Sequence, residues 1–123
     1  MMEEKNISDR RLLNAIVKCA RDKKANQIVQ IDLRRIKDAP VMWMVIIEAT
    51  STTHAVSLAD GIKEGVRNSL RVHSLSTTGE QNAEWIAVDY GTVFVHVMLS
   101  HMREFYRLEE LWGDGKIKDI SVV

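Results

Sequence analysis

The sequence predicts an α/β fold, in which a mixed β-sheet is packed with helices in a single domain. Two segments carry apolar residues at helical spacing, strand-forming runs separate and follow them, and 123 residues suit one hydrophobic core. Hydrophobic residues make up 46% and charged residues 28%, a balance typical of globular proteins. We expect one domain over residues 1–123, with residues 1–7 and 114–123 as flexible tails.

The first predicted helix begins after Ser8, whose side chain can cap it. A segment of strand formers follows at residues 27–33, and the apolar run 41–47 predicts a central strand buried on both faces. Between them, the charged residues 34–40 hold the only proline and predict a loop. The inward-facing residues expected in the helix are Leu12, Leu13, Ile16, Val17 and Ala20.

A second helix is predicted after residues 50–53, whose hydroxyl groups offer several N-caps. Gly61 and Gly65 lie four residues apart in it, and we expect them to permit close packing of this helix on the sheet. The polar residues 74–82 predict a loop. The inward-facing residues expected in this helix are Ala55, Leu58, Ala59, Ile62, Val66 and Leu70.

A β-hairpin is predicted from strands 85–89 and 92–99, with a tight turn at Tyr90 and Gly91. In that register Asp89 opposes Thr92, Ala87 opposes Phe94 and Trp85 opposes His96. The aliphatic face must meet the core, whereas the mixed face either lies under a helix or is available for recognition. The aliphatic face carries Ile86, Val88, Val93, Val95, Val97 and Leu99. The mixed face carries Trp85, Ala87, Asp89, Thr92, Phe94, His96 and Met98.

A third helix is predicted after the hairpin, capped by Ser100. Its expected apolar side consists of Met102, Phe105, Tyr106 and Leu108. Tyr, Trp and Arg commonly anchor protein interfaces, and several occur here beside glutamates. The cluster as a whole favours an interface, although single members could simply cover the sheet. Its residues are Arg103, Tyr106, Arg107 and Trp112 beside Glu104, Glu109 and Glu110.

The formal net charge is zero, with 17 basic and 17 acidic residues, which argues against tight binding of a nucleic-acid backbone. The halves differ, because residues 1–40 carry a net +4 and the residues from Val41 onward a net −4. An acidic C-terminal part suits a basic partner. The first six residues hold no apolar secretion segment, so we expect a cytoplasmic protein.

The sequence lacks the motifs typical of metal binding, phosphate binding and nucleophilic catalysis. The four histidines show no zinc-site spacing, and phosphate-binding loops and nucleophile motifs are absent, so no cofactor or metal is expected. The lone Cys19 is expected to act as a small buried hydrophobe. Asp89, His96 and Arg103 could together move protons or hold an anion, so an active site is the alternative to an interface.

The segment "EWIAVDYGTVFVHVMLSHMREFYRLEELWG", residues 84–113, resembles the pattern of the ribosomal silencing factor family, also called the Iojap-related family. The matching residues are Trp85, Asp89, Gly91, Val93, Val95, His96, Val97, Arg103, Tyr106, Leu108, Glu109, Leu111 and Trp112. The resemblance extends upstream through "KANQIVQIDLR" and "MVIIEATSTTHAVSLAD" to Leu12. The residues that depart from the family's usual ones are Met42, Glu48, Ala49, Thr78 and Thr92.

This resemblance implies a nucleotidyltransferase-like topology and a homodimer that binds the large ribosomal subunit. It further implies docking on the large-subunit ribosomal protein numbered fourteen, which hinders joining of the small subunit and represses translation. Catalysis is not expected, because Ala49-Thr50 stands where a transferase has Gly-Ser and no Asp-x-Asp pair occurs. The alternatives are a nucleotide-binding enzyme that uses the helix end near Thr52 and Thr53, and a self-associating scaffold.

The predicted function is therefore a non-catalytic antiassociation factor acting by steric exclusion. Its partner is a basic ribosomal protein, and no sequence-specific nucleic-acid binding is expected. Aromatic side chains would anchor the contact and acidic ones would orient it. The residues predicted for the recognition or dimer surface are Trp85, Asp89, Tyr90, His96, Arg103, Tyr106, Glu109 and Trp112.

Overall fold

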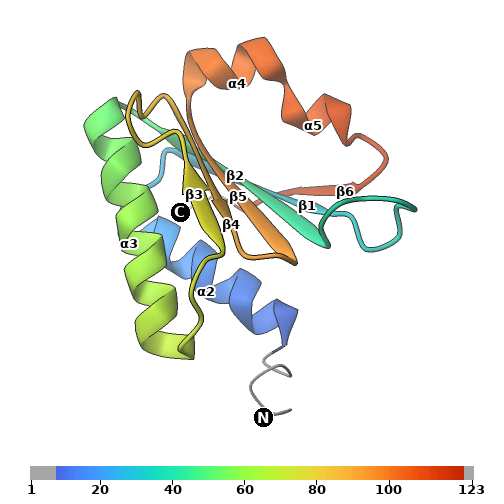
Figure 1. Cartoon of the computed structure of the whole chain (residues 1–123). Coiled ribbons are helices and arrows are strands. Elements are labelled where there is room, and N and C mark those ends of the chain that lie inside the picture. Colours follow the sequence, from blue (N-terminus) through green and yellow to red (C-terminus); the bar gives the residue numbers. More distant parts are fainter. Residues whose placement is uncertain (1–7, 121–123) are drawn as a thin grey trace.

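A computed structural model of the chain describes residues 8–120, which form one mixed sheet with helices on both faces (Figure 1). In chain order the elements are α2 (Asp9–Asp22), β1 (Gln27–Asp32), β2 (Trp43–Ala49), α3 (Thr52–Leu70), β3 (Ser76–Thr78), β4 (Trp85–Asp89), β5 (Val93–Leu99), α4 (Ser100–Tyr106), α5 (Leu108–Leu111) and β6 (Lys116–Asp119). The strand order is β3-β4-β5-β2-β1-β6, with β2 and β5 parallel and the other neighbours antiparallel. The predicted single-domain α/β fold is confirmed, and its nucleotidyltransferase-like topology stays a prediction.

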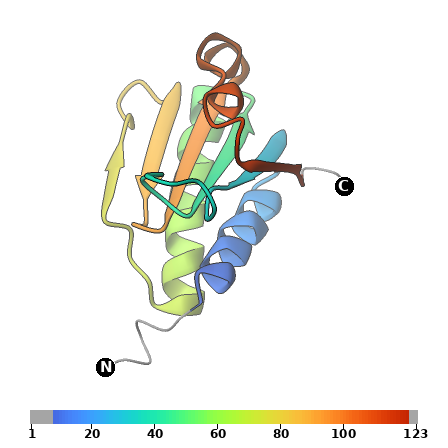
Figure 2. The same ribbon diagram turned by 90° about the vertical axis from the view of Figure 1, so that its right-hand side faces the viewer.

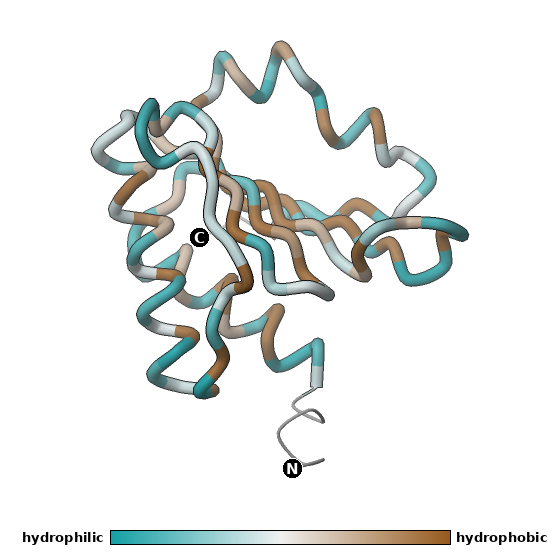
Figure 3. Tube along the Cα trace, in the orientation of Figure 1, coloured by the Kyte–Doolittle hydropathy of each residue, from teal (hydrophilic) through white to brown (hydrophobic). Residues whose placement is uncertain are grey.

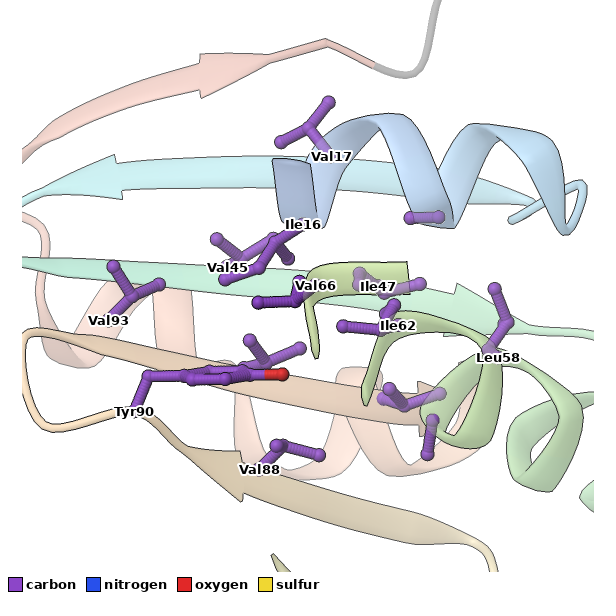
Figure 4. Close-up of a cluster of buried hydrophobic side chains, with 14 of the residues drawn as sticks. Ile16, Val17, Val45, Ile47, Leu58, Ile62, Val66, Val88, Tyr90 and Val93 are labelled. Carbon is purple, nitrogen blue, oxygen red and sulfur yellow. The ribbon is translucent and has the colours of Figure 1, made fainter. Parts of the chain in front are cut away.

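The larger core lies between the sheet and the two long helices (Figure 4). Helix α2 begins where predicted, because the Ser8 hydroxyl accepts the backbone N–H groups of Arg10 and Arg11 at 3.0 and 3.2 Å. Every residue expected to face inward from α2 and α3 is buried. The hydrophobic segments accordingly gather in the central strands (Figure 3). Helical periodicity therefore predicted this half of the core correctly.

Gly61 and Gly65 do permit close packing, but of helix on helix, so the expected contact with the sheet is wrong. A Cβ added at Gly61 would lie 2.6 Å from Cε of Lys23, and one at Gly65 would lie 2.3 Å from Sγ of Cys19. Cys19 lies in α2, and Lys23 is the C-cap residue of the same helix. Cys19 is half-buried against α3, and burial raises the pKa of its thiol. The glycines therefore set how closely α2 and α3 approach.

Gly65→Ala is expected to lower the free energy of unfolding by about 1 kcal/mol, because overpacking against Cys19 outweighs the better helix propensity of alanine. In a Cys19→Ala background the same change should raise stability by about 1 kcal/mol, since only the propensity gain remains. Urea unfolding of the four proteins measures both effects. An equal effect of Gly65→Ala in both backgrounds would contradict the contact.

The hairpin of β4 and β5 has the predicted faces but a register shifted by two residues. Asp89 pairs with Phe94, and Trp85 pairs with Met98. The turn lies one residue later than expected, because the Tyr90 N–H donates to the Val93 carbonyl at 2.9 Å. Since side chains alternate with a period of two, this shift leaves every residue of β4 and β5 on its predicted face, whereas Thr92 lies in the turn and donates to Asp9 of α2. The prediction of a tight turn at Tyr90 and Gly91 is therefore wrong. The predicted division of the strand side chains into an aliphatic and a mixed face is confirmed.

Three predicted segments differ in the structure. Within the expected loop 74–82, Ser76–Thr78 pairs with β4 as an edge strand. Within the expected tail 114–123, Lys116–Asp119 pairs with β1 as strand β6, and residues 1–7 and 121–123 lie outside the described part. The third helix divides at Arg107, whose backbone is left-handed, with φ 46°. Its N-cap is Leu99, so Ser100 does not cap it.

Candidate functional site

A second, smaller core lies on the sheet face opposite α2 and α3, beneath the arch of α4 and α5 (Figures 1 and 2). Trp85, Met102 and Trp112 pack at its margin and remain half-buried. Its buried members are Val29, Ile31, Leu33, Met44, Ile46, Met98 and Leu108. The segment between β1 and β2 also packs on this face through Ile36, Ala39 and Val41, and the attachment of the two short helices decides which of their side chains stay accessible.

Arg103 attaches the short helices to the sheet. One guanidinium nitrogen donates to the side chains of Gln27 on β1 and Glu48 on β2, at 2.9 Å for the latter, and the other pairs with Glu109 on α5. Only 11% of the Arg103 side chain is exposed, against 15% for Glu48 and 28% for Glu109. Arg103 and Glu109 were predicted on a recognition or dimer surface, and the structure places them mainly in this internal network.

Glu48 and Gln27 are members of the network that sequence reasoning missed as site residues. Glu48 is the next-to-last residue of an otherwise buried strand, and a carboxylate at such a position needs a basic partner. That signal was present in the sequence, but it does not say which of the arginines is the partner. The network borders a cavity of about 480 Å³ whose lining also includes Arg107.

A row of aromatic rings runs from β5 across β4 to α4, and we call it the aromatic row. Its successive ring centres lie 4.6 Å (Phe94 to His96), 5.7 Å (His96 to Trp85), 4.8 Å (Trp85 to Tyr106) and 4.9 Å (Tyr106 to Phe105) apart. The row begins in the sheet, where His96 is buried. It ends on the surface, where Tyr106 is 47% and Phe105 is 78% exposed. Tilted rings at these separations attract one another.

His96 serves the row as a neutral hydrogen-bond acceptor. The Trp85 Nε1–H donates to His96 Nδ1 at 2.9 Å, which leaves the ring proton on Nε2. Burial lowers the pKa of His96 to about 4, because a charged imidazole would lose its hydration. At neutral pH this histidine is therefore uncharged, and the geometry gives it a structural contact within the row.

The depressed pKa of His96 predicts that the protein loses stability as the pH falls below 6.5. The unfolded chain takes up a proton near pH 6.5 and the folded chain only near 4, so the unfolded state gains by up to about 3 kcal/mol across this window. Urea unfolding at pH 7, 5.5 and 4.5 measures the loss. His96→Gln should remove most of the slope in this window, and an unchanged slope would contradict the assignment.

Tyr90 was predicted on the recognition surface, and that prediction is wrong. Its side chain is 8% exposed and lies in the larger core beneath the helices (Figure 4). The extended pairing with Val93 puts Tyr90 on the aliphatic face, and burial raises the pKa of its hydroxyl to about 12.

Asp89 is half-buried, and its carboxylate accepts the Gly91 N–H at 2.7 Å, which stabilises the turn where Gly91 has φ +89°.

The active-site alternative receives no support from the arrangement of its three residues. Asp89 caps the turn, His96 accepts from Trp85, and Arg103 binds carboxylates on α5 and β2. Each makes separate contacts, so they do not converge on one ligand position. Within residues 8–120, no three His, Cys, Asp or Glu side chains are placed to share a metal ion. No helix in that part of the chain is both long and apolar enough to cross a bilayer.

The most exposed apolar side chains of the short helices form what we call the α4–α5 surface. It consists of Phe105, Tyr106 and Leu111 with the acidic residues Glu104 and Glu110. Phe105 was expected to face inward and is instead 78% exposed, and Leu111 is 69% exposed. Sequence reasoning named Tyr106 as a site candidate and placed Glu104 and Glu110 beside it in the expected interface cluster, but it missed Phe105 and Leu111 as exposed residues. Exposed aromatic residues beside charged ones are typical of protein interfaces.

Known proteins share both the sequence and the fold of this chain. A ribosomal silencing factor from Bacillus subtilis is 32% identical over 101 residues, covering 81% of this chain and 83% of that protein. Another from Halalkalibacterium halodurans is 29% identical over 117 residues, covering 95% and 98%. A crystal structure of a Chromobacterium violaceum protein has a TM-score of 0.80 at 26% identity, covering 85% of each chain.

The family match covers almost the whole chain. Residues 6–123 match the family described as ribosomal silencing factor during starvation, abbreviated RsfS. The relatives are named for silencing ribosomes, which is a regulatory and non-enzymatic role. The chain therefore belongs to the ribosomal silencing factor family.

Proposed function

We propose that this protein binds the large ribosomal subunit on the face that meets the small subunit and so prevents the two from joining. Translation is repressed because a large subunit in this complex cannot form a complete ribosome. The observation that carries this proposal is the α4–α5 surface, where Phe105 and Tyr106 stand exposed at the end of an otherwise packed aromatic row. Membership of the ribosomal silencing factor family also supports a role in repressing translation.

The charge of the α4–α5 surface favours a basic ribosomal protein as the contact. Glu104 and Glu110 are exposed there beside the apolar side chains, and complementary charge orients an approaching partner. The proposed partner is the large-subunit ribosomal protein numbered fourteen, as the family resemblance implies. A homodimer and a cytoplasmic location belong to the same proposal.

The proposed mechanism is steric and includes no chemical step. The Arg103 network holds α4 and α5 to β1 and β2, so the surface is presented on a rigid support. Binding energy then comes from the aromatic anchors, and the body of the sheet occupies space that the small subunit needs. A nucleotide-binding enzyme would instead need converging polar groups, and none of the contacts described above assembles them.

Reassociation of purified subunits tests this function. The protein is added to large subunits before small subunits at a magnesium concentration that favours joining, and the products are separated in a sucrose gradient. The joined fraction is expected to fall as the protein saturates the large subunit, with the protein sedimenting in the large-subunit peak. An undiminished joined fraction at saturation would overturn the proposal. A self-associating scaffold would form dimers and sediment with neither subunit.

A further inference from the structure

Three of the four basic residues of α2 form a stripe on the side of the molecule away from the α4–α5 surface. Lys18 and Arg21 lie eight and eleven residues after Arg10, which places the three on one side of a helix with 3.6 residues per turn. All three are exposed. The stripe extends for roughly 16 Å, at 1.5 Å per residue. It therefore offers positive charge along a line rather than at one point.

Strand β6 brings a further lysine to the same side. Lys118 pairs in register with Gln30 of β1, and side chains alternate between the faces of a strand. Lys118 lines a groove between α2 and the sheet edge, whereas its neighbour Asp119 bonds to Gln27 of the Arg103 network. The alternation thus sends the basic residue towards α2 and the acidic residue towards the opposite face.

The groove between α2 and β6 has a volume of about 260 Å³, and α2 runs beside this edge of the sheet (Figure 2). Among the described residues that line it, none is acidic. Its polar lining consists of Arg10, Asn14, Lys18, Arg21, Gln30 and Lys118. Four cations and two amides within one groove match a ligand with repeated negative charges and hydroxyl groups.

The cations of the groove are held in place largely by neutral groups, and the largely buried carboxylate of Asp32, which interacts electrostatically with Arg10, is hydrogen-bonded to Arg34. Arg21 donates from one guanidinium nitrogen to the Ile120 carbonyl at 2.9 Å, and Arg10 lies over the Trp43 ring at 5.4 Å. These contacts leave the charge of each guanidinium and most of its five donors for a ligand. Lys18 pairs with Asp22, but both side chains are more than half exposed, so this ion pair is weak and exchangeable.

We propose that the groove between α2 and β6 binds the sugar-phosphate backbone of RNA. The arginines and lysines would contact successive phosphates, and the amides of Asn14 and Gln30 would meet ribose hydroxyls. Trp43 is 2% exposed beneath two guanidiniums, so it is closed to base stacking, and binding is independent of base sequence. This contact goes beyond the docking of a ribosomal protein, because it is a second binding surface for an RNA-rich particle. It lies on the side of this protein opposite the α4–α5 surface.

An acidic peptide is the other polyanion that the groove must be tested against. The lining favours RNA, because its apolar members give a peptide little to anchor on: Val17 is 7% exposed and Ile120 is half-buried. Peptide recognition ordinarily needs such apolar anchors, whereas backbone phosphates need only charge and donors. The local positive charge also explains how a chain of zero net charge can bind a polyanion.

Binding of the full chain to a fluorescein-labelled 12-nucleotide oligouridylate, followed by anisotropy from 50 to 200 mM salt, tests the proposal. The logarithm of the affinity should fall linearly with the logarithm of salt, with a slope of about −2 to −3 for three to four phosphate contacts. Lys18→Gln with Lys118→Gln should weaken binding roughly 10-fold at 100 mM salt and reduce the slope by about 1.4.

The matched control is Arg67→Gln with Arg71→Gln, which removes two exposed positive charges from α3 and its C-cap. It should change the affinity less than 2-fold, roughly the effect of distant screened charges. Equal weakening by both pairs would overturn the proposal, as would no binding at 50 mM salt. A 12-residue polyglutamate that competes as well as unlabelled RNA would show a peptide site and would also overturn it. Since no ribosome is present, failure here leaves the subunit-joining test unaffected.

Discussion

Phe105→Ala with Tyr106→Ala is expected to lower the affinity for the large ribosomal subunit by roughly 100-fold or more. Aromatic anchors at the centre of an interface each contribute about 2 kcal/mol or more, and every 1.4 kcal/mol is tenfold in affinity. Phe105 is 78% exposed and Tyr106 47% exposed, so their large apolar areas are available to a partner. Co-sedimentation of the variant with purified large subunits across a concentration series measures the loss.

The control for this variant is Leu75→Ala. Leu75 is 72% exposed but lies beside β3, at the opposite edge of the sheet from β6, so its removal should leave subunit binding unchanged. The urea midpoint of the Phe105 and Tyr106 variant should fall only slightly, because Phe105 is mostly exposed and the main packing lost is the contact of Tyr106 with Trp85. Full binding by the double variant would remove the α4–α5 surface from the docking site. Equal losses in variant and control would point to a general effect of surface hydrophobicity.

Most of the larger core could be predicted, because its signals are local and repetitive. Burial of one helix side imposes a 3.6-residue period, and α2 and α3 follow that period over 14 and 19 residues. The faces of the hairpin were also predictable, since an error of two residues in register preserves the alternation. The position of the turn was predicted wrongly, because it depends on one hydrogen bond between Tyr90 and Val93.

The missed elements owe their structure to partners far away in the chain. All four residues of β6 are exposed and follow no apolar alternation, and the strand exists because β1 offers an unpaired edge. Arg107 ends α4 in a left-handed backbone conformation that is usually adopted by glycine. Because an arginine occupies this position, the sequence gives no signal that the helix ends there. The partners Glu48 and Arg103 are 55 positions apart, and only the fold brings them together.

Arg103→Met is expected to lower the free energy of unfolding by about 3 kcal/mol, because two carboxylates lose their common partner in a largely water-excluded place. Helix α4 has no buried residue and no side-chain cap, so the guanidinium is its polar attachment to the sheet, beside the packing of Met102 on the smaller core and of Tyr106 on Trp85. Urea unfolding measures the loss of stability. Arg107→Met is the matched control, since Arg107 and its partner Glu110 are 64% and 70% exposed and should contribute less than about 1 kcal/mol.

Adding Glu48→Met to the Arg103→Met protein separates two causes of the lost stability. One is the unpaired carboxylate that Arg103→Met leaves behind, and the other is the loss of packing. Glu109 is 28% exposed and can turn towards water, whereas Glu48 on β2 is held by its strand. The double variant should therefore recover at least about 1 kcal/mol of the loss, since replacing both ions by apolar groups removes the unpaired charge. Backbone amides of α4 and α5 should exchange faster in the single variant while those of β2 and β5 stay protected, because the short helices open without the sheet. Unaltered exchange in α4 and α5 would mean that Arg103 does not hold the surface in place, and the link from this ion pair to a rigid docking surface would fail.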